Sequence, residues 1–103
     1  MDAKKIKELE AKGWKVGNAA DFLRLTEEEV AMVETRLALS KMAKEIRQRK
    51  RLSQEAAARR IGSSQSRFAK LEAGDSSVSV DLMLKAVYNL GASREEVAEA
   101  IAR

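Results

Sequence analysis

The sequence predicts an all-helical protein, and three observations on composition support this. The 103 residues include no proline and only five glycines, so few positions interrupt a helix. Alanine, which has the highest helix propensity, occurs 17 times, whereas the β-branched residues Val, Ile and Thr together occur 13 times. A chain of this length forms one small domain with an extension. We expect a helical extension over residues 1–38, a main domain over 39–92 and a C-terminal amphipathic helix over 93–103.

The composition also excludes several classes of function. The chain has no histidine and no cysteine, which excludes disulfides, thiolate nucleophiles, imidazole acid–base catalysis and zinc sites of the Cys/His type. No apolar run approaches the roughly 18 residues of a membrane-spanning helix, and the N-terminus lacks the apolar stretch of a signal peptide. We therefore expect a cytoplasmic protein that is not an enzyme, with no metal, cofactor, membrane or small-molecule substrate.

The formal net charge of +4 is distributed unevenly along the chain. Residues 41–70 contain ten basic and two acidic residues, a charge of +8, so the remaining residues carry −4. A basic block within an otherwise acidic chain is typical of proteins that bind polyanions. A solvated helix face is the alternative for a charge run taken alone.

Capping residues and glycines predict where the first helices begin and end. A first helix is expected over residues 2–12, before a turn at 13–17, and Asn18 is a favourable N-cap for a short second helix. Thr26 and Glu29 form a capping-box pattern, which predicts the start of a third helix. No glycine or proline interrupts the chain from there to residue 62, so this helix can be long.

Two apolar stripes lie on different faces of this long helix. At 100° per residue one stripe is formed by Val30, Val33 and Leu37, and the other by Leu39, Ala43 and Ile46. A single helix cannot turn both stripes toward one core, so the helix either bridges two packing units or breaks near Ser40. We favour a long helix that bridges, which makes residues 1–38 a separate packing unit or a partner surface.

Two short helices with a tight turn between them follow the long helix. Ser53 can cap a helix that runs to about Ile61, and Gly62 ends it because this position often needs a left-handed backbone. Ser64 can cap a second helix that ends at Gly74. Two helices joined by a turn of three to four residues form a helix-turn-helix. The packed positions expected in it are Ala58, Phe68 and Leu71.

The end of the chain predicts two more helices. One covers about residues 79–91, and Ser93 with Glu96 forms a second capping box. Val97 and Ile101 then lie four residues apart on one face of a short helix. Both roles fit this pattern: the helix closes the core or adds to a dimer seam.

Residues 39–92 resemble the lambda-repressor-like, Xre-type helix-turn-helix family. The matching residues are Leu52-Ser53-Gln54-Glu55, Ala58, Ile61-Gly62, Ser64-Gln65-Ser66, Phe68, Leu71-Glu72 and Gly74, followed by the segment 79–91. Two residues depart from the family pattern: Ser63 replaces an apolar turn residue and Ala57 replaces a leucine. The resemblance implies an all-α, lambda-repressor-like helix-turn-helix bundle that binds operator DNA as a homodimer and represses transcription.

The resemblance also implies which residues contact DNA. In this family the second helix of the pair enters the major groove with its first residues on base edges. Carried over, the base contacts are Gln65, Ser66, Arg67 and, one turn on, Lys70. The alternatives are plain helix surface for Gln65 and Ser66 and a phosphate contact for Arg67. Phosphate contacts are expected from Gln54 and Ser64, which begin the two helices, and from the basic residues Lys41, Arg49, Lys50, Arg51, Arg59 and Arg60.

Arg47 and Glu72 match a pair that forms a structural salt bridge in related repressors. On this interpretation the two residues hold helices together and do not contact DNA. The alternative is that Arg47 joins the phosphate contacts.

The N-terminal flank resembles the extension of small antitoxins encoded beside RelE/HigB-like ribonuclease toxins. The matching residues are Leu9-Glu10-Ala11-Lys12-Gly13-Trp14-Lys15-Val16-Gly17, Phe22-Leu23 and Leu37-Ala38-Leu39-Ser40. This resemblance implies a toxin partner, repression of the protein's own operon and a protein-partner surface at Trp14, Phe22, Leu23, Val30, Val33 and Leu37. The alternatives are a mini-core in the flank, a stand-alone regulator without a toxin, and a protein-binding transcription adaptor.

Overall fold

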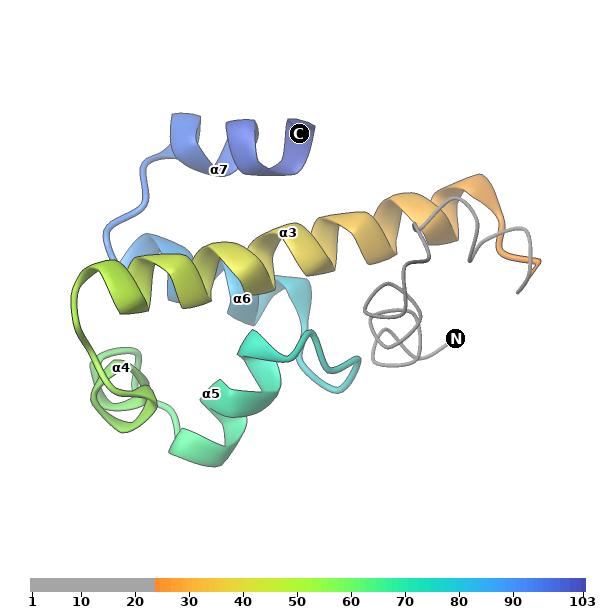
Figure 1. Ribbon diagram of the computed structural model, residues 1–103. Helices are drawn as coiled ribbons and strands as arrows, with labels where there is room; N and C mark the ends of the chain where they lie inside the picture. The colour runs from red at the N-terminus through yellow and green to blue at the C-terminus, as the bar shows by residue number, and fades with distance from the viewer. Residues whose placement is uncertain (1–23) are drawn as a thin grey trace.

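The computed structural model describes residues 24–103, which form helices labelled α3 to α7 (Figure 1). Their bounds are α3 (Glu27–Arg49), α4 (Gln54–Arg60), α5 (Gln65–Glu72), α6 (Val80–Asn89) and α7 (Arg94–Ala102). The described residues contain no strand, which confirms the all-α fold class. The helices expected over residues 2–12 and 18–23 and the turn between them lie outside the described residues.

Each of these helices begins at a serine or threonine cap. The hydroxyl of Thr26 accepts a hydrogen bond from the Glu29 amide, and the Thr26 amide donates to the Glu29 carboxylate, so the predicted capping box is present. Ser93 and Glu96 form the second box in the same way. The remaining caps accept from the amide three residues on: Ser53, Ser64 and Ser79. The caps predicted at Thr26, Ser53, Ser64 and Ser93 are therefore confirmed, whereas the cap predicted at Asn18 lies outside the described residues.

Helix α3 is continuous over its 23 residues and does not break near Ser40. Ser40 is buried, and its hydroxyl donates to the Leu37 carbonyl at 3.0 Å, a bond made within the helix. The second stripe, Leu39, Ala43 and Ile46, is buried in the main core. The first stripe is less covered, since Val33 is 8% exposed but lies outside that core, and Val30 and Leu37 are half-buried. The favoured prediction of one long helix is confirmed.

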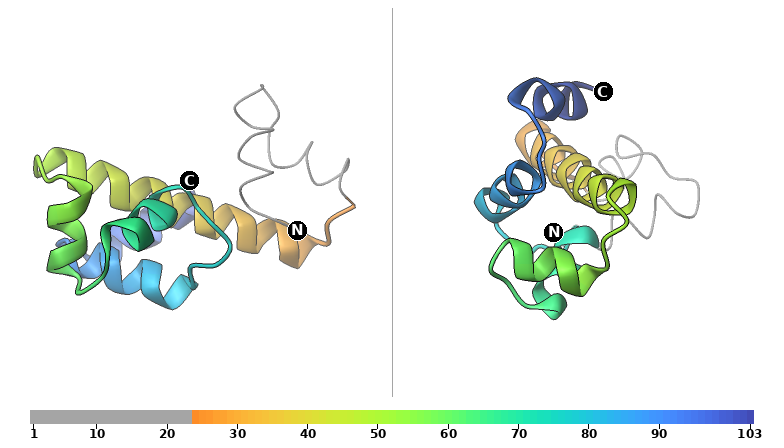
Figure 2. Two further views of the ribbon diagram at one scale, coloured as in Figure 1. Left: turned by 90° about the horizontal axis from the view of Figure 1, so that it is seen from below. Right: turned by 90° about the vertical axis from the view of Figure 1, so that its left-hand side faces the viewer.

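The helices pack in layers around α3 (Figures 1 and 2). Helix α7 lies on one side of α3, whereas α4 and α5 lie on the opposite side, and α6 runs along α3 between them. The core draws on every described helix: Leu39, Met42, Ala43, Ile46, Ala57, Ala58, Phe68, Leu71, Val78, Met83, Ala86, Val87, Leu90 and Val97. Of the two roles open for the last helix, the burial of Val97 shows that α7 closes the core, while Ile101 is 43% exposed.

The first half of α3 packs along the loop between α5 and α6. A Cβ at Gly74 would lie 3.5 Å from both Leu37 and Ser40, so this glycine sits close against α3. Further along, the guanidinium of Arg36 donates a hydrogen bond to the Val78 carbonyl. The boundary expected at residue 38 therefore falls within a continuous helix whose residues on both sides contact the main domain.

Candidate nucleic-acid interface

Helices α4 and α5 form a helix-turn-helix. Gly62 has φ +71°, in the left-handed region that favours glycine, and its amide donates to the Arg59 carbonyl at 3.1 Å. The Ser63 amide donates to the Ala58 carbonyl at 2.8 Å, which closes the turn, and Ser64 then caps α5. The Ser63 hydroxyl is buried with no hydrogen-bond partner among the described residues. A buried hydroxyl without a partner costs stability, which gives a physical reason for the apolar residue that the family usually has here.

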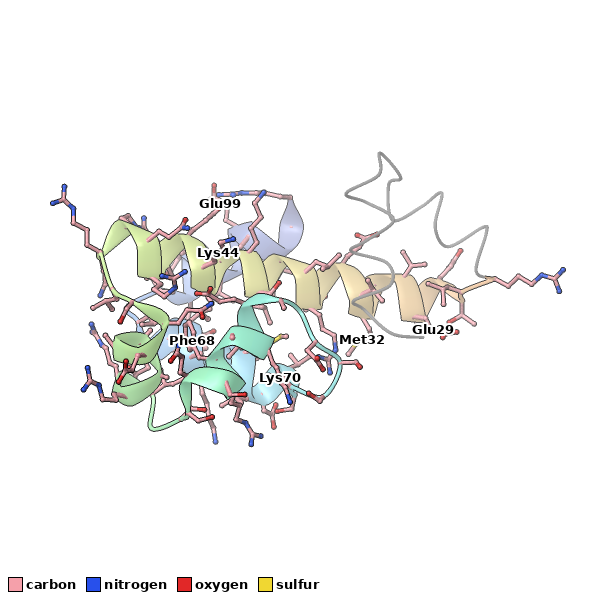
Figure 3. All side chains as sticks on the ribbon, turned by 60° about the horizontal axis from the view of Figure 1, so that its bottom comes forward. Glu29, Met32, Lys44, Phe68, Lys70 and Glu99 are labelled. Atoms are coloured by element: carbon pink, nitrogen blue, oxygen red, sulfur yellow. The ribbon has the colours of Figure 1, made fainter. Side chains whose placement is uncertain are left out.

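The outer face of α5 carries the four residues predicted to contact bases. Their side chains are all exposed: Gln65, Ser66, Arg67 and Lys70. The inner face is anchored by Phe68, which is 0% exposed and lies inside the bundle, whereas Lys70 lies on the outer side (Figure 3). The fixed inner face holds the outer face in one orientation, so the first turn of α5 can enter a groove as a rigid unit.

A recess lies between this outer face and the α5–α6 loop. It has a volume of about 290 Å³ and is lined by Ser64, Ser66, Arg67, Lys70, Ser77 and Val78. Two cations and three hydroxyls in one recess match the donors that hold phosphate oxygens in protein–DNA complexes. The sequence interpretation missed Ser77, because it considered only the helices of the motif. The signal was the serine-rich segment that directly follows the glycine at the end of α5.

Arg47 and Glu72 form an ion pair that connects α3 to α5. Arg47 Nε lies 2.5 Å from Glu72 Oε2, and Nη2 donates to Oε1 at 3.1 Å. The third nitrogen, Nη1, donates to the Leu52 carbonyl at 2.9 Å, in the connection to α4. Glu72 is 6% exposed. All three guanidinium nitrogens therefore bond within the protein. This geometry fits the predicted structural salt bridge and leaves no nitrogen without a bond for a phosphate.

Gln54 joins this ion pair. Its Nε2 donates to Glu72 Oε1 at 3.0 Å, and the residue is half-buried. The phosphate contact expected of Gln54 therefore competes with a bond inside the protein, since the amide nitrogen is its donor group. The sequence did not indicate that Gln54 bonds to the carboxylate of this ion pair.

The basic residues expected to contact phosphates are spread over several sides of the molecule. Arg59 and Arg60 are exposed at the end of α4, and Arg51 is exposed in the α3–α4 connection with φ +57°. The Lys50 ammonium lies at the end of α6, because a Cβ at Gly91 would be 2.9 Å from its Nζ. Of these residues, Arg51, Arg59 and Arg60 lie on α4 or directly before it.

Two further basic residues line a groove between α3 and α7. Lys41 and Arg49 border this groove of about 320 Å³, together with Glu96 and Glu99 of α7. Hydrogen bonds with the backbone and side chain of Ser93 lower the pKa of Glu96, and the charge of Arg49 lowers it further. Arg49 thus lies on the side of α3 that carries α7, which is opposite the side that carries α5 (Figure 2).

The surface predicted to bind a protein partner is described only in part, because Trp14, Phe22 and Leu23 lie outside the described residues. On α3, Val33 and the 52% exposed Met32 line a groove of about 240 Å³ that begins at Leu25. The acidic residues Glu28 and Glu29 also line it, and Figure 3 shows Glu29 and Met32 at the same end of α3. The sequence interpretation missed Met32, which lies one residue outside the predicted stripe.

A comparison with known protein families matches the region of the chain that contains α4 and α5. A family model described as a helix-turn-helix domain matches residues 38–100, which is more than half of the chain. The match begins within α3, ends within α7 and contains every residue that lines the recess. No curated protein and no solved structure was found to match. None of the described helices is both long enough and apolar enough to cross a membrane.

Proposed function

The chain belongs to the helix-turn-helix domain family of DNA-binding regulators, and from this premise we propose that it is a sequence-specific repressor of transcription. The observation that carries the proposal is the exposed first turn of α5 above the buried Phe68, with a cationic recess beside it. This arrangement suits a helix that reads the major groove. The proposed repressor acts in the cytoplasm and has no enzymatic activity.

In the proposed complex Gln65 and Arg67 read bases. A glutamine amide pairs with the N6 and N7 atoms of adenine, and an arginine guanidinium pairs with the O6 and N7 atoms of guanine. Ser66 and Lys70 contact the adjacent base edges or sugar–phosphate backbone from the same exposed face. Ser64 and the recess beside it hold a phosphate.

The remaining phosphate contacts come from the cations that lie near α4 and α5. We assign this role to Arg51, Arg59 and Arg60, all of which are exposed. Lys50 and Arg49 contribute only to the general positive field, because they lie beside α6 and α7. Lys41, which lines one groove with α7 and another with Glu72 of α5, adds to the same field. Gln54 contributes to phosphate binding through its helix start, while its amide nitrogen stays on Glu72.

The experiment is a binding titration of the full chain with duplex DNA from its own promoter region, against a scrambled duplex. Each bidentate base contact contributes about 1–3 kcal/mol of discrimination, so the double variant Gln65→Ala/Arg67→Ala should lose at least tenfold in preference for the promoter. Arg94→Ala, which removes an exposed arginine from α7, is the matched control and should retain the preference. Specific binding that survives in the double variant would refute the site assignment.

The proposed repressor binds as a homodimer to a pseudo-palindrome. Helix-turn-helix dimers place their recognition helices one helical turn of DNA apart, about 34 Å. Duplexes with half-sites 10 base pairs apart should therefore bind more tightly than duplexes with 5 additional base pairs between them. Equal affinity for both spacings would contradict a dimer on the operator.

We also propose that the chain is the antitoxin of a toxin–antitoxin operon and represses its own promoter. The support is the start of α3, where Glu27, Glu28 and Glu29 are exposed beside the groove at Met32. An acidic rim around an apolar groove favours a basic protein partner. Co-purification of the chain from its native locus, followed by mass spectrometry, tests this role. A small basic ribonuclease should be recovered; transcription machinery instead would favour an adaptor, and no partner would favour a stand-alone regulator.

A further inference from the structure

Arg36 connects the flank of the molecule to its DNA-binding side. It lies on α3, two residues before the region that the family model matches. Its Nη1 donates to the Val78 carbonyl, 42 positions further along the chain, and the contact is partly buried. The bond therefore joins the first half of α3 to the α5–α6 loop.

The residue that Arg36 holds is part of the wall of the DNA-side recess. The Val78 side chain is 2% exposed and belongs to the core, and Val78 with Ser77 forms the loop side of the recess. The helix side of the same recess is formed by Arg67 and Lys70. The width of the recess therefore depends on where the loop lies relative to α5.

Two short local bonds shape the loop. The Ser77 amide donates to the Asp75 carboxylate at 2.8 Å, and the Val78 amide donates to the Asp75 carbonyl at 3.1 Å. The Val78 carbonyl, in contrast, bonds to a charged group on another helix. Hydrogen bonds to charged groups are stronger than neutral ones, and a partly buried carbonyl that loses its partner bears a desolvation cost. Loss of Arg36 would thus favour loop positions in which this carbonyl reaches water.

We propose that Arg36 is a positioning residue for DNA binding. It holds the α5–α6 loop so that Ser77 lies against the same DNA phosphate as Ser64 and Lys70, the other donors at the edge of the recess. In this proposal Arg36 itself does not touch DNA, because its Nη1 bonds to the Val78 carbonyl and the residue lines the groove at Met32 and Val33, which Arg67 and Lys70 do not line. The proposal rests on the proposed DNA-binding function and adds to it a residue that precedes the matched family region.

The test compares three variants of the full chain in titrations with the promoter duplex at several salt concentrations. Arg36→Met keeps an unbranched side chain in the groove but removes the donor, and Arg36→Lys keeps one donor. Arg94→Ala removes a charge from exposed α7 and is the control. We expect Arg36→Met to weaken binding about five- to tenfold. We also expect the slope of log K against log salt to stay nearly unchanged, because the lost contact is the neutral Ser77 hydroxyl and the slope follows the phosphates neutralised by Lys and Arg. Arg36→Lys should recover most of the affinity, and Arg94→Ala should stay within about twofold.

A double-mutant cycle separates positioning from a general loss of stability. As a single substitution, Ser77→Ala should weaken DNA binding about two- to fivefold. When added to Arg36→Met it should have no further effect on DNA binding, because the loop no longer places Ser77 at the phosphate. Amide exchange at residues 77 and 78 should accelerate in Arg36→Met, while the core of α5 stays protected.

Three outcomes would overturn the role of Arg36. These are promoter affinity of Arg36→Met within twofold of the unmodified protein, full additivity with Ser77→Ala, or a salt slope smaller by about 0.9, which would show that Arg36 itself neutralises a phosphate. If the unmodified protein itself binds no DNA, the proposed function fails first and this role fails with it. Binding by the unmodified protein with no effect of Arg36→Met refutes the role of Arg36 alone.

Discussion

The two halves of α3 differ in what they contact. In the second half, Leu39, Ala43 and Ile46 are buried in the core, and Arg47 reaches α4 and α5. In the first half, Arg36 and Leu37 contact the α5–α6 loop, and Met32 is 52% exposed. One continuous helix therefore supports the fold with one half and presents a surface with the other. The stability of this protein should depend far more on the second half than on the first.

The largest expected effect comes from emptying the core beneath the second half of α3. Leu39→Ala should lower the free energy of unfolding by about 3–4 kcal/mol, because removal of a fully buried leucine loses its burial energy and leaves a cavity. Met32→Ala in the first half should change it by less than about 0.5 kcal/mol. Urea denaturation followed by circular dichroism measures both values. Equal losses would show that the two halves are equally structural.

A smaller loss is expected from breaking the ion pair that the second half makes with α5. Glu72→Ala should lower the free energy of unfolding by about 2–3 kcal/mol, since it leaves Arg47 without its carboxylate in a largely buried position. Arg47 keeps 14% of its side chain exposed, which moderates the cost relative to a fully buried charge.

The matched control for this pair is Glu99→Ala. Glu99 and Arg103 form an exposed pair four residues apart on α7, at 3.8 Å. Exposed pairs of this kind contribute little, so the melting temperature should hardly change. An unchanged melting temperature for Glu72→Ala as well would refute the structural role of the buried pair.

The sequence predicted the elements that depend on neighbours along the chain. The capping box at Thr26, the left-handed glycine at Gly62 and the buried face of α5 all follow from residues within a few positions of one another. The contact of Arg36 with Val78 spans 42 positions, and no local pattern indicates it.

The directions of the surface cations could not be predicted either. Whether Arg49 faces DNA or α7 depends on how α7 packs on α3, which is a tertiary property. Gln54 illustrates the same limit. Its position at a helix start indicated a phosphate contact, but its amide also lies within reach of Glu72 on the next helix, and that distance is set by the crossing of α4 and α5.

The smallest expected effect concerns the cap that begins the first half of α3. Thr26→Ala removes the hydroxyl that accepts the Glu29 amide and should cost about 1 kcal/mol or less. Because this half contributes little to the core, the cost should appear as local fraying. Amide exchange over residues 27–33 should accelerate, while exchange over 39–46 and the melting temperature stay nearly unchanged. Ser53→Ala is the matched change at the start of α4, where it should lower the melting temperature, since α4 buries Ala57 and Ala58 in the core. A similar fall in melting temperature for both variants would contradict the division of α3 into a second half that supports the core and a first half that forms an exposed surface.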